Sequence, residues 1–156
     1  MPPGSAAAGV QVHPYPHSYL VGAFGTPEGA VTVTAADLPD LETAPPPQFD
    51  GPGGRWSPET LLCAAVADCF ILSFRAISRA SRLDWRRLEC RVDGKLDRVD
   101  RVAQFTAFKT VVTLVVPPGT DVARAGKLLE QAEHACLISN SLRAHRSLES
   151  QVLVGE

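Results

Sequence analysis

Residues 57–74 read SPETLLCAAVADCFILSF, and this stretch decides the fold. Serine followed by proline is a strong helix start, because a serine side chain caps the helix and proline suits its first position. Apart from Glu59 and Asp68, the stretch is apolar on nearly every side, which is typical of a helix buried in a core. No helix-breaking residue follows until about Arg82, so the sequence predicts one long helix, residues 58–82, through the middle of the protein.

The segments around this helix predict strands and a second helix. Residues 37–56 are dense in proline and glycine, so we expect a long ordered loop there. The expected elements are strands at 19–24, 30–34, 85–97, 104–116 and 148–154, a helix at 122–135 and a short helical segment at 139–144. The larger elements follow the order β-β-α-β-β-α-β. This order predicts an α+β fold in which an antiparallel sheet wraps around the long buried central helix.

Composition describes an ordinary globular chain of 156 residues, with 45% hydrophobic and 21% charged residues. This length fits a flexible N-terminal arm at residues 1–17 and a single domain at 18–156. The net charge of −2 and the pI of about 6.1 argue against a nucleic-acid surface, which needs an excess of Lys and Arg. The N-terminus does not resemble a signal peptide, and the apolar run at 61–67 is too short to cross a bilayer. We therefore expect a cytoplasmic protein that does not bind membranes.

The chain has four cysteines, Cys63, Cys69, Cys90 and Cys136, and no CxxC pair. A thioredoxin motif and a cysteine-rich zinc site are therefore not expected. In a reducing cytosol, cysteines are catalytic, redox-active or merely buried. Free cysteine packs as a small hydrophobe, so each thiol has a purely structural interpretation as well. We interpret Cys63 and Cys90 as core residues.

Two motifs resemble the OsmC/Ohr family. The first is the helix start Ser57-Pro58-Glu59 followed by Ala67-Asp68-Cys69-Phe70, which places a cysteine ten residues after the glutamate. The second is HACLISNSL, which runs from His134 to Leu142 and contains Cys136. With the order of elements, the resemblance covers about residues 18–154.

The resemblance implies a thiol-dependent peroxidase that reduces organic hydroperoxides and works as an intertwined homodimer with sites at the subunit interface. Cys69 would attack the peroxide and become a sulfenic acid, and Cys136 would resolve it as a Cys69–Cys136 disulfide. An external dithiol would then restore both thiols. Glu59 would orient a nearby arginine. No cofactor and no metal is implied.

One position departs from the family pattern. The arginine that the family carries before the Pro-Glu pair corresponds to Gln48, and residues 18–36 contain no arginine. Arg55 is the nearest substitute, four residues before Glu59. Two other interpretations therefore stay open. In the first, the chain is an OsmC-like domain without peroxidase activity that binds a small apolar ligand at the dimer interface. In the second, it is a structural protein that shares only the architecture.

Overall fold

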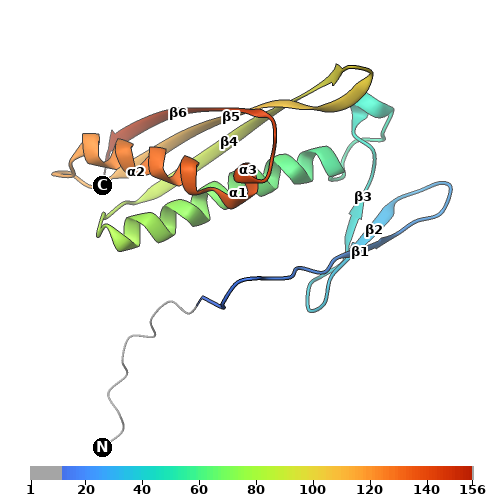
Figure 1. The fold of residues 1–156 in the computed structure, drawn as a ribbon, viewed down its shortest axis with the longest axis horizontal. Helices are drawn as coiled ribbons and strands as arrows, with labels where there is room; N and C mark the ends of the chain where they lie inside the picture. Colours follow the sequence, from blue (N-terminus) through green and yellow to red (C-terminus); the bar gives the residue numbers. More distant parts are fainter. Residues whose placement is uncertain (1–11, 156) are drawn as a thin grey trace, which may run out of the picture.

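The computed structural model describes residues 12–155, which form two three-stranded sheets and a long helix (Figure 1). The small N-terminal sheet lies at the beginning of the long helix, whereas the larger sheet runs along its length (Figure 1). The elements are β1 (Gly22–Phe24), β2 (Val31–Thr34), β3 (Leu41–Thr43), α1 (Pro58–Ala80), β4 (Arg87–Val99), β5 (Val102–Val116), α2 (Val122–Ala135), α3 (Leu137–Asn140) and β6 (His145–Val154). The α+β class and the central helix are confirmed. Of the arm expected at 1–17, residues 1–11 lie outside the described residues.

The N-terminal sheet contains a strand that the sequence did not predict. Strand β3 pairs with β2 inside the segment expected to be a loop, and a 3₁₀ helix follows at Pro47–Phe49. Thr43 forms a parallel bridge with Trp56, and the Ala44 N–H donates to the Trp56 carbonyl at 3.0 Å. Most of the prolines and glycines of this segment lie in the turns between these short elements. They therefore limit the length of each element without preventing its formation.

The larger sheet is only partly antiparallel. Strands β4 and β5, expected at 85–97 and 104–116, pair antiparallel, with an irregularity between Lys95 and Leu96. Strand β6 instead pairs with β5 in parallel, with Thr110 opposite Leu148. This corrects the prediction of a wholly antiparallel sheet. The physical reason is the connection: α2 carries the chain back along the sheet, so β6 starts at the end where β5 started.

Helix α1 begins where the sequence predicts. The Thr60 N–H donates to the Ser57 hydroxyl at 3.1 Å, and the Ser57 N–H donates to the Thr60 hydroxyl at 2.9 Å. This reciprocal pair satisfies two of the N–H groups that a helix start leaves without a partner, with Pro58 in the first helical position. The helix is therefore anchored firmly at the end that carries Glu59.

One face of α1 forms the core, and the part of the chain that the structure describes leaves the opposite face uncovered. The residues Val66, Phe70, Phe74 and Ser78 recur every fourth position and are buried. Phe70 and Phe74 pack with the β4–β5 strands and with the inner face of α2, as a cluster that includes Val112, Leu114, Val116, Leu128 and Leu129. On the outer face Leu72 is 51% exposed. The expectation of a helix buried on nearly every side is thus wrong for one chain.

The exposure of α1 also bears on the membrane expectation. By length and composition the helix is long and apolar enough to cross a membrane, although only 22% of its most apolar window is buried within the chain. The apolar run at 61–67 is thus part of a longer apolar helix, and the expectation that the protein does not bind membranes stays a prediction. Long core helices of soluble proteins have the same length and composition. The exposed apolar face therefore indicates that something packs against α1, but it does not distinguish a lipid bilayer from another protein surface.

Candidate functional site

The fold brings Cys69 and Cys136 together although they are far apart in the sequence. Cys69 lies in the middle of α1 and is half-buried, and Cys136 lies between α2 and α3 and is fully buried. The Cys136 thiol donates to the carbonyl of Val66, one turn before Cys69, at 4.0 Å. Burial raises the pKa of Cys136, and the adjacent Cys69 thiol raises it further, while hydrogen bonds from Ser139 lower it. The two thiols are free and adjacent.

Cys69 has a polar neighbour of its own. Its Sγ lies 3.9 Å from the Ser73 hydroxyl, one turn later on α1. Leu72, on the uncovered face, is three residues from Cys69, and positions three apart on a helix lie on the same side. Cys69 therefore borders the uncovered face of α1, whereas Cys136 approaches it from inside the protein.

Glu59 lies in a different place, at the beginning of α1. It lines a cleft of about 660 Å³ together with Gln48, Cys63, Lys95 and Phe105. One carboxylate oxygen of Glu59, Oε2, is buried and has no hydrogen-bond partner among the described residues. Gln48 stands at the position that corresponds to an arginine in the family pattern, and it lines the same cleft as Glu59. An arginine at this position would lie close enough to pair with the glutamate. A buried carboxylate oxygen without a donor is costly, so the cleft is poised to receive one.

The cleft also contains a cation that the sequence did not single out. Lys95 lies at the irregularity in the β4–β5 hairpin, where the strand register shifts. A register shift re-aims the side chains beside it. No sequence motif marks this lysine, because its place depends on the strand pairing.

Arg55 does not line this cleft. Its Nη1 lies 2.5 Å from Oε2 of Glu42, and both side chains are largely exposed. Arg55 therefore forms a surface ion pair with Glu42 on β3 and does not contact the cleft. Its role at the site stays a prediction.

Helix geometry separates Glu59 from Cys69 within one chain. They lie ten residues apart on a continuous helix, and a rise of 1.5 Å per residue puts them about 15 Å apart along its axis. A glutamate side chain does not span that distance. Of the four predicted site residues, one chain therefore brings together only the two cysteines.

The other two cysteines are held as neutral thiols. Burial raises the pKa of Cys63, and the charge of Asp93 adds to this. Burial raises the pKa of Cys90 to about 12, with further contributions from Glu133 and Cys136. Because the thiolate is the reactive form, these values favour the structural interpretation of Cys90.

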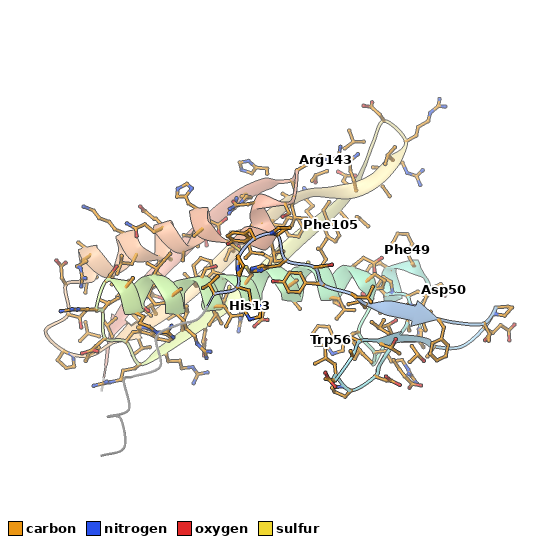
Figure 2. The ribbon with its side chains drawn as sticks, turned by 60° about the horizontal axis from the view of Figure 1, so that its bottom comes forward. His13, Phe49, Asp50, Trp56, Phe105 and Arg143 are labelled. Carbon is orange, nitrogen blue, oxygen red and sulfur yellow. The ribbon has the colours of Figure 1, made fainter. Side chains whose placement is uncertain are left out.

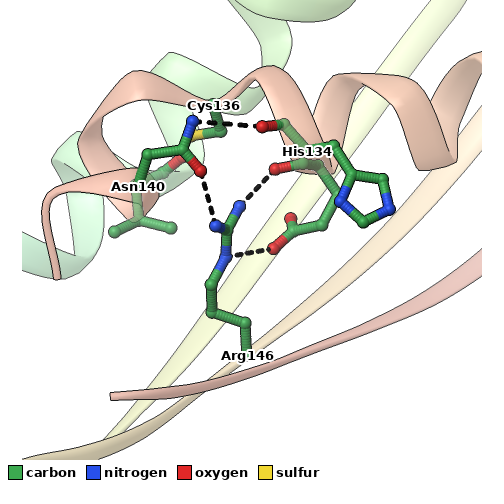
Figure 3. Close-up of polar contacts among 6 residues, drawn as sticks. His134, Cys136, Asn140 and Arg146 are labelled. Atoms are coloured by element: carbon green, nitrogen blue, oxygen red, sulfur yellow. Dashed lines mark hydrogen bonds and ion pairs between the residues drawn. The ribbon is translucent and has the colours of Figure 1, made fainter. Parts of the chain in front are cut away.

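A polar network that sequence reasoning missed surrounds Cys136. Arg146 on β6 binds the side chains of Glu133 and Asn140, which flank the cysteine on either side (Figure 3). Asn140 belongs to the motif around Cys136, but its partner on β6 has no signal in the sequence. Phe49 and Phe105 belong instead to the Glu59 cleft, and Figure 2 shows Phe49 beside the beginning of α1.

These features define an α+β protein with two free thiols meeting at the middle of a central helix. The model of the family described as OsmC-like protein matches residues 51–151, and the chain belongs to this family. It is 27% identical over 133 residues to the uncharacterised protein YmaD of Bacillus subtilis, covering 83% of this chain and 84% of the relative. It is 28% identical over 106 residues to peroxiredoxin OsmC of Escherichia coli, covering 67% and 72%.

Solved structures share the fold. An OsmC-like protein of unknown function from Vibrio cholerae superimposes with a TM-score of 0.78 at 16% identity, over 86% of this chain and 99% of that one. An organic hydroperoxide resistance protein OsmC from Legionella pneumophila gives a TM-score of 0.64 at 25% identity, over 88% and 98%. The first similarity supports the architecture alone.

Proposed function

We propose that the protein is a thiol-dependent peroxidase that reduces organic hydroperoxides, with Cys69 as the nucleophile and Cys136 as the resolving thiol. The observation that carries this proposal is the pairing of a half-buried thiol with a buried one at the centre of α1. Relatives named peroxiredoxin OsmC and organic hydroperoxide resistance protein support the same chemistry.

Bonds are made and broken only at these two sulfur atoms, the hydroperoxide and an external dithiol. The Cys69 thiolate attacks one peroxide oxygen, the O–O bond breaks, and the alcohol leaves with a proton while Cys69 becomes a sulfenic acid. The Cys136 thiol then attacks this sulfur, which forms the Cys69–Cys136 disulfide and releases water. A small dithiol reduces the disulfide to two thiols and itself becomes a disulfide.

The site is shared between two copies of the chain in this proposal. Glu59 lies about 15 Å along the helix from Cys69 of its own chain, and its buried Oε2 has no hydrogen-bond partner within residues 12–155. A second copy that covers the apolar outer face of α1 in the antiparallel sense would bring its Glu59 cleft, with Gln48 and Lys95, to the first copy's Cys69. The homodimer thus buries an uncovered apolar face and completes the site with one contact.

The test is hydroperoxide consumption with cumene hydroperoxide and dihydrolipoamide. Cys69→Ser is expected to abolish turnover, and Cys136→Ser to leave a sulfenic acid on Cys69 that dimedone traps. Cys90→Ala is the matched control, because its thiol has a pKa of about 12 and stays neutral. Consumption by Cys69→Ser at the wild-type rate would contradict the proposal.

A second candidate function rests on Gln48. An amide in place of a guanidinium brings no full charge to the cleft, whose walls include Phe49, Leu96 and Phe105. An OsmC-like domain that binds a small apolar ligand there is the alternative. The pH dependence of Cys69 alkylation separates the two, since a thiol that ionises below neutral pH belongs to the peroxidase and one near its ordinary pKa of about 8.5 belongs to the binding domain.

A further inference from the structure

The end of α2 carries a cluster of hydrogen bonds that the proposed chemistry does not yet use. The last carbonyls of a helix lack partners inside the helix. Here the Glu133 carbonyl accepts from the Arg146 guanidinium, and the His134 carbonyl accepts from the Asn140 side-chain amide at 3.1 Å (Figure 3). A cation at this end also complements the helix dipole.

The same guanidinium makes two further bonds. Its Nε donates to Oε1 of Glu133 at 2.9 Å, and its Nη1 donates to Oδ1 of Asn140 at 2.7 Å. Arg146 thus links β6 to the last turn of α2 and to α3, and we call Arg146, Glu133 and Asn140 the Arg146 clamp. The Arg146 and Glu133 side chains are only 25% and 13% exposed, so water screens this ion pair less than the surface pairs of the chain.

Cys136 is the residue that the Arg146 clamp encloses. It has the extended backbone angles φ −62° and ψ 102° at the junction of two helices, so its backbone lies outside the regular geometry of both. Its own N–H reaches the Glu133 carbonyl only at 3.4 Å, while its carbonyl accepts from the Asn140 N–H at 2.9 Å. The residues on both sides of Cys136 are therefore held from β6.

We propose that Arg146 is a positioning residue for the resolving step, because its fork of hydrogen bonds holds the Cys136 thiol against α1 beside Cys69. This inference rests on the proposed peroxidase function. Condensation of a sulfenic acid with a thiol requires both sulfur atoms at reacting distance, and a displacement of about 1 Å can slow such a step by about a hundredfold. Attack of Cys69 on the peroxide does not involve Cys136. The Arg146 clamp therefore acts on the second step and not on the first.

The experiment separates these two steps in the full-length protein. Reduced Arg146→Ala is mixed with cumene hydroperoxide, and mass spectrometry follows the Cys69 sulfenic acid as its dimedone adduct and the Cys69–Cys136 disulfide. Sulfenic acid formation is expected at the wild-type rate, disulfide formation about tenfold slower or more, and the dimedone adduct accumulates. Wild-type disulfide formation in the folded variant would overturn the proposal.

Two further variants protect this test from a simple loss of folding. Glu133→Gln keeps the side-chain volume and removes only the ion pair, so it is expected to slow the same step in a chain that folds. Arg87→Ala is the matched control, because Arg87 is also a strand arginine but its ion pair with Glu89 is largely exposed. Circular dichroism verifies that each variant is folded at the assay temperature. A delay in Arg87→Ala equal to that in Arg146→Ala would contradict a specific role.

A measurement without peroxide distinguishes failure of the Arg146 clamp from failure of the proposed function. In glutathione buffers the reduced protein and oxidised glutathione exchange to the Cys69–Cys136 disulfide and two reduced glutathione molecules. The equilibrium constant is expected to fall about tenfold or more in Arg146→Ala, because the two thiols are less well aligned. If the wild type forms no sulfenic acid, the peroxidase proposal fails. The equilibrium constant of the glutathione exchange then decides by itself whether Arg146 aligns the two thiols. An unchanged constant would overturn the role of Arg146.

Discussion

Mixing two inactive variants tests whether the site is shared between subunits. Glu59→Gln removes the charge of the cleft carboxylate, and Cys69→Ser removes the nucleophile. Each homodimer is expected to turn over peroxide poorly. The structure places the two residues about 15 Å apart along one helix, so a working site would draw them from different chains.

The expected recovery follows from counting sites. In an equimolar random mixture about half of the dimers contain one chain of each kind, and in a symmetric dimer each of these has one site with both Cys69 and Glu59 intact. The mixture is therefore expected to reach about a quarter of wild-type activity, and purified mixed dimers about half. If both residues belonged to the same chain, neither mixed site would be intact.

Co-expression of the two variants with different affinity tags supplies the mixed dimer directly. Hydroperoxide consumption with dihydrolipoamide gives the activity, and sedimentation gives the fraction of dimers. Mixed dimers that are no more active than the mean of the two parents would refute the shared site. A chain that sediments as a monomer while turning over peroxide would refute it as well.

Further predictions follow from four single positions. In the proposed dimer, Gln48→Arg adds a guanidinium to the cleft that meets the partner's thiol and is expected to stabilise the Cys69 thiolate, so that alkylation near pH 6 becomes about tenfold faster or more; the pH profile of Cys69 alkylation measures this, and an unchanged profile contradicts it. Cys90, with a pKa of about 12, is expected to alkylate roughly a thousandfold more slowly at pH 8 than a free thiol. Because the folded chain holds this proton more tightly than the unfolded chain, urea midpoints should fall as the pH rises from 9 to about 12. Phe74→Ala removes a fully buried ring and should cost about 3–5 kcal/mol of unfolding free energy, whereas Leu72→Ala should mainly weaken the dimer.

The parts of the fold that could be predicted from sequence are those determined by local signals. Helix α1 begins at the serine–proline pair because capping involves only neighbouring residues, and α2 has the expected bounds, Val122–Ala135, because Asp121 caps it in the same way. The strand β3 was missed because it is short and bounded by prolines, and its pairing partner decides its conformation. The parallel pairing of β6 was missed because strand direction depends on the path of the connection.

The residues of the candidate site also differ in whether local sequence signals or tertiary pairing place them. Cys69 and Cys136 could be predicted as a pair from their motifs, since each motif is a local feature. The Arg146 clamp could not, because it joins the end of α2 to a strand that is brought beside it only by the parallel crossover. Lys95 was missed for the related reason that its direction depends on a register shift between two strands.

The position of each thiol, and not its residue type, determines what it can do. Cys63, Cys90 and Cys136 all have a raised pKa because burial disfavours the charged form. Cys69 borders the outer face of α1, which one chain leaves uncovered. Among the described residues, the polar neighbours of the Cys69 thiol are the Ser73 hydroxyl and the Cys136 thiol. A second copy of the chain would bring the cleft that holds Glu59 and Lys95, so the same contact that buries the apolar face would also supply the missing charges.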